Sequence, residues 1–268
     1  MELKDIERSI IKKYRKVLWG RFVRGVDEYK LVNAGDKIAV CISGGKDSML
    51  LAKLLQELKR HGKIDFELKF IVMNPGYNNE NLEKIKNNLE VLGIEAEIFE
   101  SDIFAVVDNI AKESPCYLCA RMRRGALYKK AEDLGCNKIA LGHHFDDVIE
   151  TIMLNILYAG EYKTMMPKLK SSNYSGMELI RPMYYVKEVD IISWARYNDL
   201  EFINCACRMT KRESNTGKRK EIKELIKSLK ENNENVDINI LRSAENVNID
   251  AIVGYKNKDE NVSFLDEY

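Results

Sequence analysis

The stretch Lys37–Leu55, KIAVCISGGKDSMLLAKLL, decides the fold, because it joins an apolar run to an amphipathic run through a polar, glycine-rich loop. Lys37–Cys41 predicts a short buried strand, and Asp47–Lys59 predicts the helix that follows it. Gly44 and Gly45 permit positive φ and let the backbone approach a ligand closely. Successive N–H groups in such a turn, backed by a helix N-terminus, form an anion site. The stretch therefore predicts a bound polyanion at the end of the strand.

The side chains of this loop suit the same ligand. Ser43 and Ser48 can donate hydroxyl hydrogen bonds, and Lys46 can offset negative charge. The loop matches neither of two common phosphate-binding patterns, G-x-x-x-x-G-K-[ST] and G-x-G-x-x-G. The alternative is a glycine turn whose polar residues are merely exposed, and the combination of strand, loop and helix favours the anion site.

Predicted strands and helices alternate along much of the chain. Further strands are predicted at 68–74, 95–99 and 138–141, and further helices at 79–92, 120–134, 146–158 and about 187–199. This order predicts an α/β fold, a parallel sheet with helices on both faces. Ligands of such sheets bind beyond the carboxyl ends of the strands. We expect an N-terminal helical segment (1–30), a nucleotide-binding domain (31–210) and a C-terminal helical extension (211–268).

Composition restricts the class of protein. The 268 residues are 45% hydrophobic, enough for a sizeable core, and no window approaches the uninterrupted apolar length of a membrane span. The charged N-terminus lacks an apolar signal-peptide core, so we expect a cytoplasmic protein without a membrane partner. Six cysteines at irregular spacing then favour metal or redox chemistry over disulfides. Cys41 and Cys136 we interpret as buried structural residues.

The net charge of +1 hides an uneven distribution. Residues 1–30 hold nine basic and five acidic side chains, and residues 208–220 hold six basic and one acidic. Residues 231–268 hold nine acidic and three basic side chains. The basic blocks fit a polyanionic partner, and solvated helix faces are the alternative.

Four cysteines form two close pairs, Cys116 with Cys119 (C-Y-L-C) and Cys205 with Cys207 (C-A-C). Four thiols could close a structural zinc site. Three thiols could instead hold a [4Fe-4S] cluster with one iron left open for a ligand such as sulfide. The spacing alone leaves both options, and a redox pair at C-x-x-C, open.

A second polar loop, GHHFDD at 142–147, follows a predicted strand and opens a predicted helix. Its carboxylates, Asp146 and Asp147, suit Mg²⁺, a hard cation that keeps several waters. Asp147 could instead cap the helix, a common role of Asp at that place. His143 and His144 could contact a ligand or pack the loop.

The SGGKDS string after an apolar strand resembles the PP-loop of the ATP-pyrophosphatase superfamily, whose members bind ATP, transfer AMP to a substrate oxygen and release pyrophosphate. The strings PCYLCARMRRG (115–125) and LGHHFDDVIET (141–151) resemble the family of tRNA 2-thiocytidine synthetases (TtcA). YAGEYKTMMPKL (158–169) and the pair Arg181-Pro182 are similar as well. The order and spacing match from about Arg8 to Cys207.

The resemblance implies a Rossmann-like PP-loop domain, ATP with Mg²⁺, and a [4Fe-4S] cluster. Cys116, Cys119 and one distal cysteine would hold the cluster. Alignment on the preceding helix places the distal ligand at Cys205, and Cys207 stays an alternative because C-x-C replaces a wider expected spacing. The implied nucleotide-binding residues are Ser43, Gly44, Gly45, Lys46, Asp47, Ser48, Asn74, Gly142, His143 and Asp146. Of these, Lys46, Asp47 and Asp146 are the catalytic candidates.

The implied reaction is ATP-dependent thiolation of a tRNA pyrimidine, in which the C2 oxygen is adenylated and then replaced by sulfur. The partners would be tRNA and a sulfur donor, either sulfide or the persulfide of a cysteine desulfurase. Arg121, Arg123 and Arg124 fit a tRNA phosphate backbone. Two alternatives stay open, a lysidine-synthetase-like adenylating ligase and a tRNA-binding PP-loop protein with structural zinc. The sequence leaves cytidine or uridine, and monomer or homodimer, undecided.

Overall fold

The computed structural model describes residues 1–101, 103, 115–203, 215–257 and 260–266. These residues form two compact units, which are described separately. The first comprises residues 1–148 and 166–216, and the second comprises residues 149–165 and 217–268. The predicted division of the chain at residues 31 and 211 stays a prediction.

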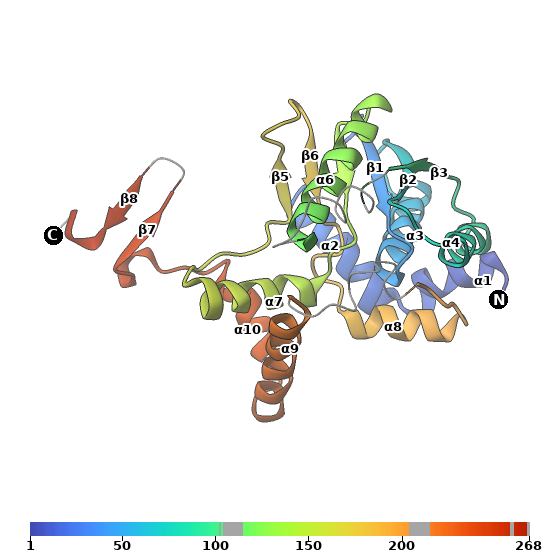
Figure 1. Cartoon of the computed structure of the whole chain (residues 1–268). Coiled ribbons are helices and arrows are strands. Elements are labelled where there is room, and N and C mark those ends of the chain that lie inside the picture. Colours follow the sequence, from blue (N-terminus) through green and yellow to red (C-terminus); the bar gives the residue numbers. More distant parts are fainter. Residues whose placement is uncertain (102, 104–114, 204–214, 258–259, 267–268) are drawn as a thin grey trace. The chain divides into compact units, whose positions relative to one another are not determined.

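A six-stranded sheet organises the first unit (Figure 1). Its spatial order is β3 (Ala96–Glu100), β2 (Glu67–Asn74), β1 (Lys37–Ile42), β4 (Lys138–Ala140), β6 (Glu178–Ile180) and β5 (Lys168–Lys170). All neighbours run parallel except β5, which is antiparallel to β6. This mostly parallel sheet confirms the predicted α/β fold. The chain moves from β1 outward to β3 and then returns to β4 on the other side of β1, so β1 and β4 flank a topological switch point.

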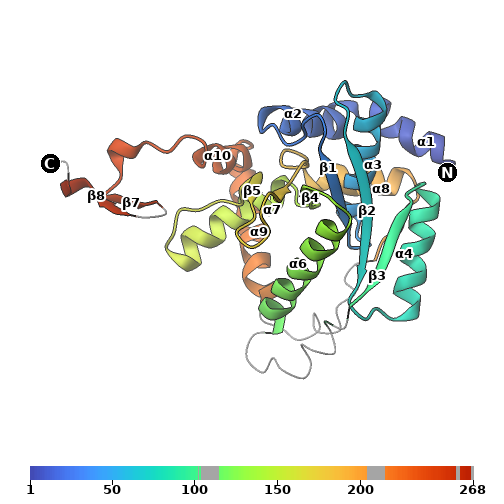
Figure 2. The same ribbon diagram turned by 90° about the horizontal axis from the view of Figure 1, so that it is seen from above.

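Helices cover both faces of this sheet (Figure 2). Successive side chains of β1 accordingly point into two different cores. Ile38, Val40 and Ile42 belong to one apolar core, and Ala39 and Cys41 belong to the other. The first core contains the N-terminal segment, α3 (Lys46–His61), α4 (Asn79–Val91) and α8 (Glu188–Tyr197). The second core is closed by α6 (Pro115–Asp133). A strand buried on both faces is the expected consequence of a continuous apolar run.

The N-terminal segment contains α1 (Leu3–Arg8), two π-helical turns, η1 (Ser9–Lys13) and η2 (Arg15–Trp19), and α2 (Gly20–Glu28). Helix α7 (Phe145–Leu154) begins in the first unit and continues into the second. The strands predicted at 68–74, 95–99 and 138–141 agree with β2, β3 and β4 to within about one residue. Strands β5 and β6 lie between residues 158 and 187, where no strand was predicted, because three-residue strands carry no periodic signal.

The second unit is mainly helical. It contains η3 (Asn155–Ala159), α9 (Asn215–Asn232), α10 (Val236–Ser243) and the short turns η5 (Ile249–Ala251) and η6 (Phe264–Asp266). The predicted helical tail is confirmed in α9 and α10. It is wrong at the hairpin of β7 (Gly254–Lys256) and β8 (Asn261–Ser263), which the charge pattern did not indicate. None of the helices described is both long and apolar enough to cross a bilayer.

Candidate nucleotide site

The two glycine-bearing loops of the sequence meet at the carboxyl ends of β1 and β4. A Cβ atom on Gly142 would lie 3.0 Å from the Ser48 nitrogen and 3.1 Å from the Asp47 carbonyl carbon. Gly44 has φ +86°, and a Cβ there would lie 2.6 Å from Ile85 Cγ1 and 2.7 Å from Ile203 Cδ1. Both positions therefore require glycine, Gly142 for the approach of two backbones and Gly44 for its conformation and its packing.

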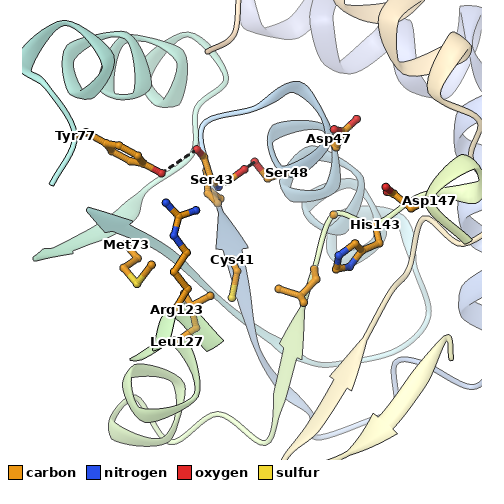
Figure 3. Close-up of a pocket in the computed structure, with 13 residues that line it drawn as sticks. Cys41, Ser43, Asp47, Ser48, Met73, Tyr77, Arg123, Leu127, His143 and Asp147 are labelled. Carbon is orange, nitrogen blue, oxygen red and sulfur yellow. Dashed lines mark hydrogen bonds between the residues drawn. The ribbon is translucent and has the colours of Figure 1, made fainter. Parts of the chain in front are cut away.

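A cavity of about 300 Å³ opens where these loops meet (Figure 3). Figure 3 shows Met73, Arg123 and Leu127 on one side and Asp47, His143 and Asp147 on the other, with Ser43 and Ser48 between them. Its remaining lining residues are Cys41, Ile42, Tyr77, Leu141 and Gly142. One part is thus apolar and suits a base, and the rest is polar and suits phosphates.

Hydrogen bonds among its own groups fix the glycine loop. The Ser48 hydroxyl accepts from the Ser43 N–H at 3.1 Å, donates to the Gly45 carbonyl at 3.0 Å, and lies 3.1 Å from the Ser43 hydroxyl. Tyr77 donates to the Ser43 carbonyl across the cavity mouth at 3.5 Å. The structure therefore places both predicted serines at the cavity, with hydroxyls that also stabilise the loop.

Lys46 is held by two carboxylates. Its Nζ lies 3.2 Å from Asp47 Oδ2 and 3.0 Å from Glu188 Oε1. Burial alone would lower the pKa of Lys46, but the two carboxylates outweigh burial and the pKa is raised. Glu188 is the first residue of α8, and its N–H donates to Asp146 Oδ2 at 2.7 Å. Asp146 thus satisfies a free N–H at the start of α8, and the structure does not place it among the cavity-lining residues.

Asp147 caps a helix, as the sequence suggested, and it also lies at the cavity, while its role toward Mg²⁺ stays a prediction. Its Oδ2 accepts the His144 N–H at 3.1 Å, which caps α7, and the residue also lines the cavity. His144 is only 6% exposed and lies among carboxylates, with Nε2 3.5 Å from Asp147 Oδ2 and 3.8 Å from Asp47 Oδ1. Its Nδ1 lies 3.7 Å from Asp146 Oδ2.

Asp47 is a largely buried acid of the site. Burial raises its pKa, while the charges of His144 and Lys46 oppose that rise. In the part of the chain that is described, Asp47 Oδ1 is buried and accepts no hydrogen bond. A buried carboxylate oxygen without a donor suits a cation, and Mg²⁺ commonly takes one or two carboxylates together with phosphates and water. Among the described residues, no three His, Cys, Asp or Glu side chains could hold an ion by themselves, so Mg²⁺ stays a prediction.

Asn74 acts on the site indirectly. It is buried at the end of β2, where its Oδ1 accepts the N–H groups of Gly76 and Tyr77 at 3.1 and 2.8 Å. Its Nδ2 donates to Glu100 Oε1 at 3.1 Å. Asn74 therefore shapes the turn that places Tyr77 at the cavity, and it does not line the cavity itself.

Two arginines belong to the site in ways that the sequence did not specify. Arg123 of α6 lines the cavity, and the signal for it was the basic string after Cys119. Arg181 Nε donates to His143 Nδ1 at 3.3 Å, which fixes the ring of a cavity residue. Burial, aided by the nearby charge of Arg124, lowers the pKa of Arg181 to about 10. In the sequence, the Arg181-Pro182 pair was the only feature that pointed to Arg181.

The paired cysteines are only partly within the described structure. Cys116 and Cys119 occupy the first turn of α6, and the backbone alone is described there. Cys205 and Cys207 lie outside the described residues. Cys41 and Cys136 are buried in the second core, as predicted, and burial raises the pKa of both thiols. The chemistry of the paired thiols fits a cluster, whose ligand set stays a prediction.

Comparison with known proteins agrees with this geometry. A profile of the PP-loop domain family matches residues 20–229. The tRNA-cytidine(32) 2-sulfurtransferase of Geobacter metallireducens is 36% identical over 238 residues, which cover 88% of this chain and 91% of that protein. The chain belongs to the TtcA-like family of PP-loop proteins. This finding confirms the resemblance drawn from the SGGKDS, PCYLCARMRRG and LGHHFDDVIET strings.

Two further proteins are similar to this TtcA-like chain. The tRNA-cytidine(32) 2-sulfurtransferase of Neisseria meningitidis is 42% identical over 185 residues, 67% of this chain and 57% of that protein. The U34-tRNA thiolase NcsA from Methanococcus maripaludis, solved with its [4Fe-4S] cluster, superposes with a TM-score of 0.67 at 26% identity. That superposition covers 84% of this chain and 76% of NcsA.

Proposed function

We propose that this protein catalyses ATP-dependent thiolation of a cytidine at C2 in tRNA. One observation carries the proposal: helix α6 bears Cys116 and Cys119 in its first turn and Arg123, four residues after Cys119, at the nucleotide cavity. At 1.5 Å per residue, four residues correspond to about 6 Å along the helix axis. Thiols suited to sulfur chemistry thus lie on the element that also forms the ATP site.

The names of the relatives supply the substrate class. Two of the relatives are tRNA-cytidine(32) 2-sulfurtransferases at 36% and 42% identity, whereas the U34-tRNA thiolase NcsA is 26% identical. Cytidine is therefore the preferred target. A C2 oxygen is a poor leaving group, so both ATP and a sulfur source are needed.

The first step would be adenylation. The C2 oxygen attacks the α-phosphorus of ATP, and pyrophosphate leaves. The N–H groups of the glycine loop, the Ser43 hydroxyl and Lys46 are the groups available to stabilise the negative charge of the departing pyrophosphate. Asp47, whose Oδ1 accepts no hydrogen bond within the described structure, would take Mg²⁺. Glu188 holds Lys46 in place from the start of α8.

The second step exchanges oxygen for sulfur. Sulfide attacks C2, the C2–O bond breaks, and AMP leaves with the former base oxygen. A [4Fe-4S] cluster on Cys116, Cys119 and either Cys205 or Cys207 would supply an open iron that binds sulfide as a Lewis acid. The sulfur donor in the cell and the cytoplasmic location stay predictions from the sequence, which leaves monomer or homodimer undecided.

Metal analysis separates this proposal from its two rivals. Anaerobically purified protein should be brown and contain about four irons with matching sulfide, and it should release pyrophosphate only when tRNA is added. A colourless protein with about one zinc on four thiols would favour the zinc-bearing tRNA-binding protein. Pyrophosphate release that depends on free lysine, with no need for the thiols, would favour the lysidine-forming ligase.

A further inference from the structure

Four cations crowd the outer face of the N-terminal segment. Lys12, Lys13, Arg15 and Lys16 are all exposed. Within the described residues, none of the four forms an ion pair, whereas Arg21 on the next turn pairs with Asp190 at 2.6 Å. The charge of these four side chains is therefore available to a partner.

The backbone explains why the four cations stay on one face. The buried hydrophobic residues of this segment repeat at a strict four-residue spacing: Ile6, Ile10, Tyr14, Leu18, Phe22 and Val26. In an α-helix of 3.6 residues per turn, every fourth residue is rotated by about 40° around the helix axis relative to the one before, so residues at this spacing would gradually turn away from the core. The π-helical turns η1 and η2 are wound more widely and reduce that drift. The same winding keeps residues 12, 13, 15 and 16 in solvent, and π-helical turns are rare and often functional.

Aromatic side chains lie among these cations. Lys13 Nζ lies 3.6 Å from the ring centroid of Tyr197, the last residue of α8, and Tyr197 is 42% exposed. Tyr14 packs edge-on against Tyr197 at 6.0 Å and fixes its ring. A shallow hollow beside it is lined by the four cations and Trp19. The surface thus holds one exposed ring, Tyr197, and one half-buried ring, Trp19, among the cations. Cations beside accessible aromatic rings form the usual surface for a nucleic-acid strand, with rings for bases and cations for phosphates.

Helix α8 connects this surface to the nucleotide site. Glu188 at its start pairs with Lys46, and Tyr197 at its end contacts Lys13. The nine steps from Glu188 to Tyr197, at 1.5 Å each, set the two ends about 14 Å apart. An RNA that presents one base to the cavity has other phosphates at this distance.

We propose that Lys12, Lys13, Arg15, Lys16, Trp19 and Tyr197 form a second RNA contact, which binds the phosphate backbone of the tRNA away from the target nucleotide. We name these six residues the N-terminal basic surface. The inference rests on the proposed function. The surface acts in binding, so its loss should raise the KM for tRNA and leave kcat and the KM for ATP unchanged.

The test uses two charge-matched variants of the full holoenzyme. Lys12, Lys13, Arg15 and Lys16 are changed to Gln together in one variant. In the control, the exposed Lys59, Lys63, Lys69 and Lys170 are changed to Gln. The dissociation constant for tRNA is measured at several salt concentrations. Each lost phosphate contact should reduce the steepness of the plot of log affinity against log salt by about 0.7–0.9. The slope of the first variant should therefore be shallower by up to about 2.8–3.6 if all four side chains contact phosphates. The control should keep the wild-type slope.

A third variant isolates the aromatic contribution. Tyr197→Leu keeps an apolar side chain against Tyr14 and removes the ring. Loss of one stacked base should weaken tRNA binding by about tenfold, with the salt slope unchanged. Lysine labelling of the wild type needs no substitution, and tRNA should protect Lys12, Lys13 and Lys16 but not Lys59.

The outcomes separate this inference from the proposed function. The N-terminal basic surface would be overturned, while thiolation stands, if the four-fold variant kept the wild-type affinity and salt slope and tRNA gave no protection of Lys12, Lys13 and Lys16 in the wild type. The four-fold variant could instead bind tRNA like the wild type, turn over with sulfide, and lose turnover only when a protein delivers the sulfur. That result would assign the surface to the sulfur-donor protein and would also overturn the inference. A wild-type enzyme that thiolates no tRNA would instead overturn the proposed function.

Discussion

Replacing Gly44 by alanine tests the geometry of the phosphate loop directly. Gly44 has φ +86°, and an added Cβ would lie 2.6 Å from Ile85 Cγ1 and 2.7 Å from Ile203 Cδ1. Two costs therefore add at one position, a backbone conformation that L residues disfavour and a collision with the core behind the loop. Gly35 isolates the first cost, because it has φ +81° and no atom within 4 Å of its Cβ position.

The two costs can be estimated separately. A left-handed conformation costs an alanine roughly 1–2 kcal/mol, and forcing a methyl group into a packed core costs about 1–3 kcal/mol. Gly44→Ala should thus lose about 2–5 kcal/mol and Gly35→Ala about 1–2 kcal/mol. For a unit of this size, 1 kcal/mol shifts the Tm by about 2–4 °C, so Gly44→Ala should melt about 4–20 °C lower. Gly45 has a negative φ, and no atom lies closer than 3.7 Å to its Cβ position. The free energy of unfolding of Gly45→Ala should therefore stay within about 1 kcal/mol of wild type.

Thermal melts followed by circular dichroism, with ATP absent, give the three Tm values, and pyrophosphate release gives the activity. We expect the order of loss to be Gly44→Ala, then Gly35→Ala, then Gly45→Ala. Activity should fall in Gly44→Ala and stay normal in Gly35→Ala, because Gly35 precedes the N-terminal end of β1, whereas the cavity lies at the carboxyl end of that strand and Gly35 does not line it. If Gly44→Ala were no less stable than Gly35→Ala, the space behind the loop would not be closed and the packing argument would fail.

Three further predictions address the site chemistry. Lys46→Met should slow pyrophosphate release by about 10²–10³-fold, the usual cost of one preorganised charge-stabilising group; equal slowing in Lys59→Met would contradict this specific role. Asp47→Asn should raise the denaturation midpoint at pH 7. Burial raises the pKa of Asp47, so the folded state favours the neutral carboxyl, and this contribution to stability is present below the ordinary pKa and lost as pH rises through the folded-state pKa. At pH 7 the ionised Asp47 is therefore less favourable in the folded protein than the neutral amide of Asn. The stability difference between Asp47→Asn and wild type should vanish near pH 4, and a difference that does not change with pH would refute this reasoning. Cys116→Ser should lose iron and visible absorption on anaerobic purification, whereas Cys136→Ser, in the second core, should keep both.

Sequence reasoning succeeded where a feature is local. The order of strand, loop and helix at Lys37–His61 follows from consecutive residues, and the structure shows that order. Gly44 was expected to permit a positive φ, and its φ is +86°. Strands β5 and β6 were missed because three residues give no period, and their pairing depends on neighbours in the sheet.

Long-range contacts account for what the sequence did not predict at the site. Glu188 pairs with Lys46 across 142 positions of the chain, and no local pattern marks it. Asp146 and Asp147 are adjacent and identical in type, yet one caps α8 and the other lines the cavity. Arg123 was interpreted with Arg121 and Arg124 as a tRNA contact, but the structure places it at the nucleotide cavity.

The direct test of the account is nucleoside mass spectrometry of tRNA incubated anaerobically with the holoenzyme, ATP and isotopically labelled sulfide. The account predicts a 2-thiocytidine that carries the label, with AMP and pyrophosphate released in equal amounts to it. It also predicts that no such nucleoside forms without ATP or with Cys116→Ser. Unmodified tRNA from a protein that carries its full cluster and binds ATP, or labelled thiouridine in place of thiocytidine, would contradict the account.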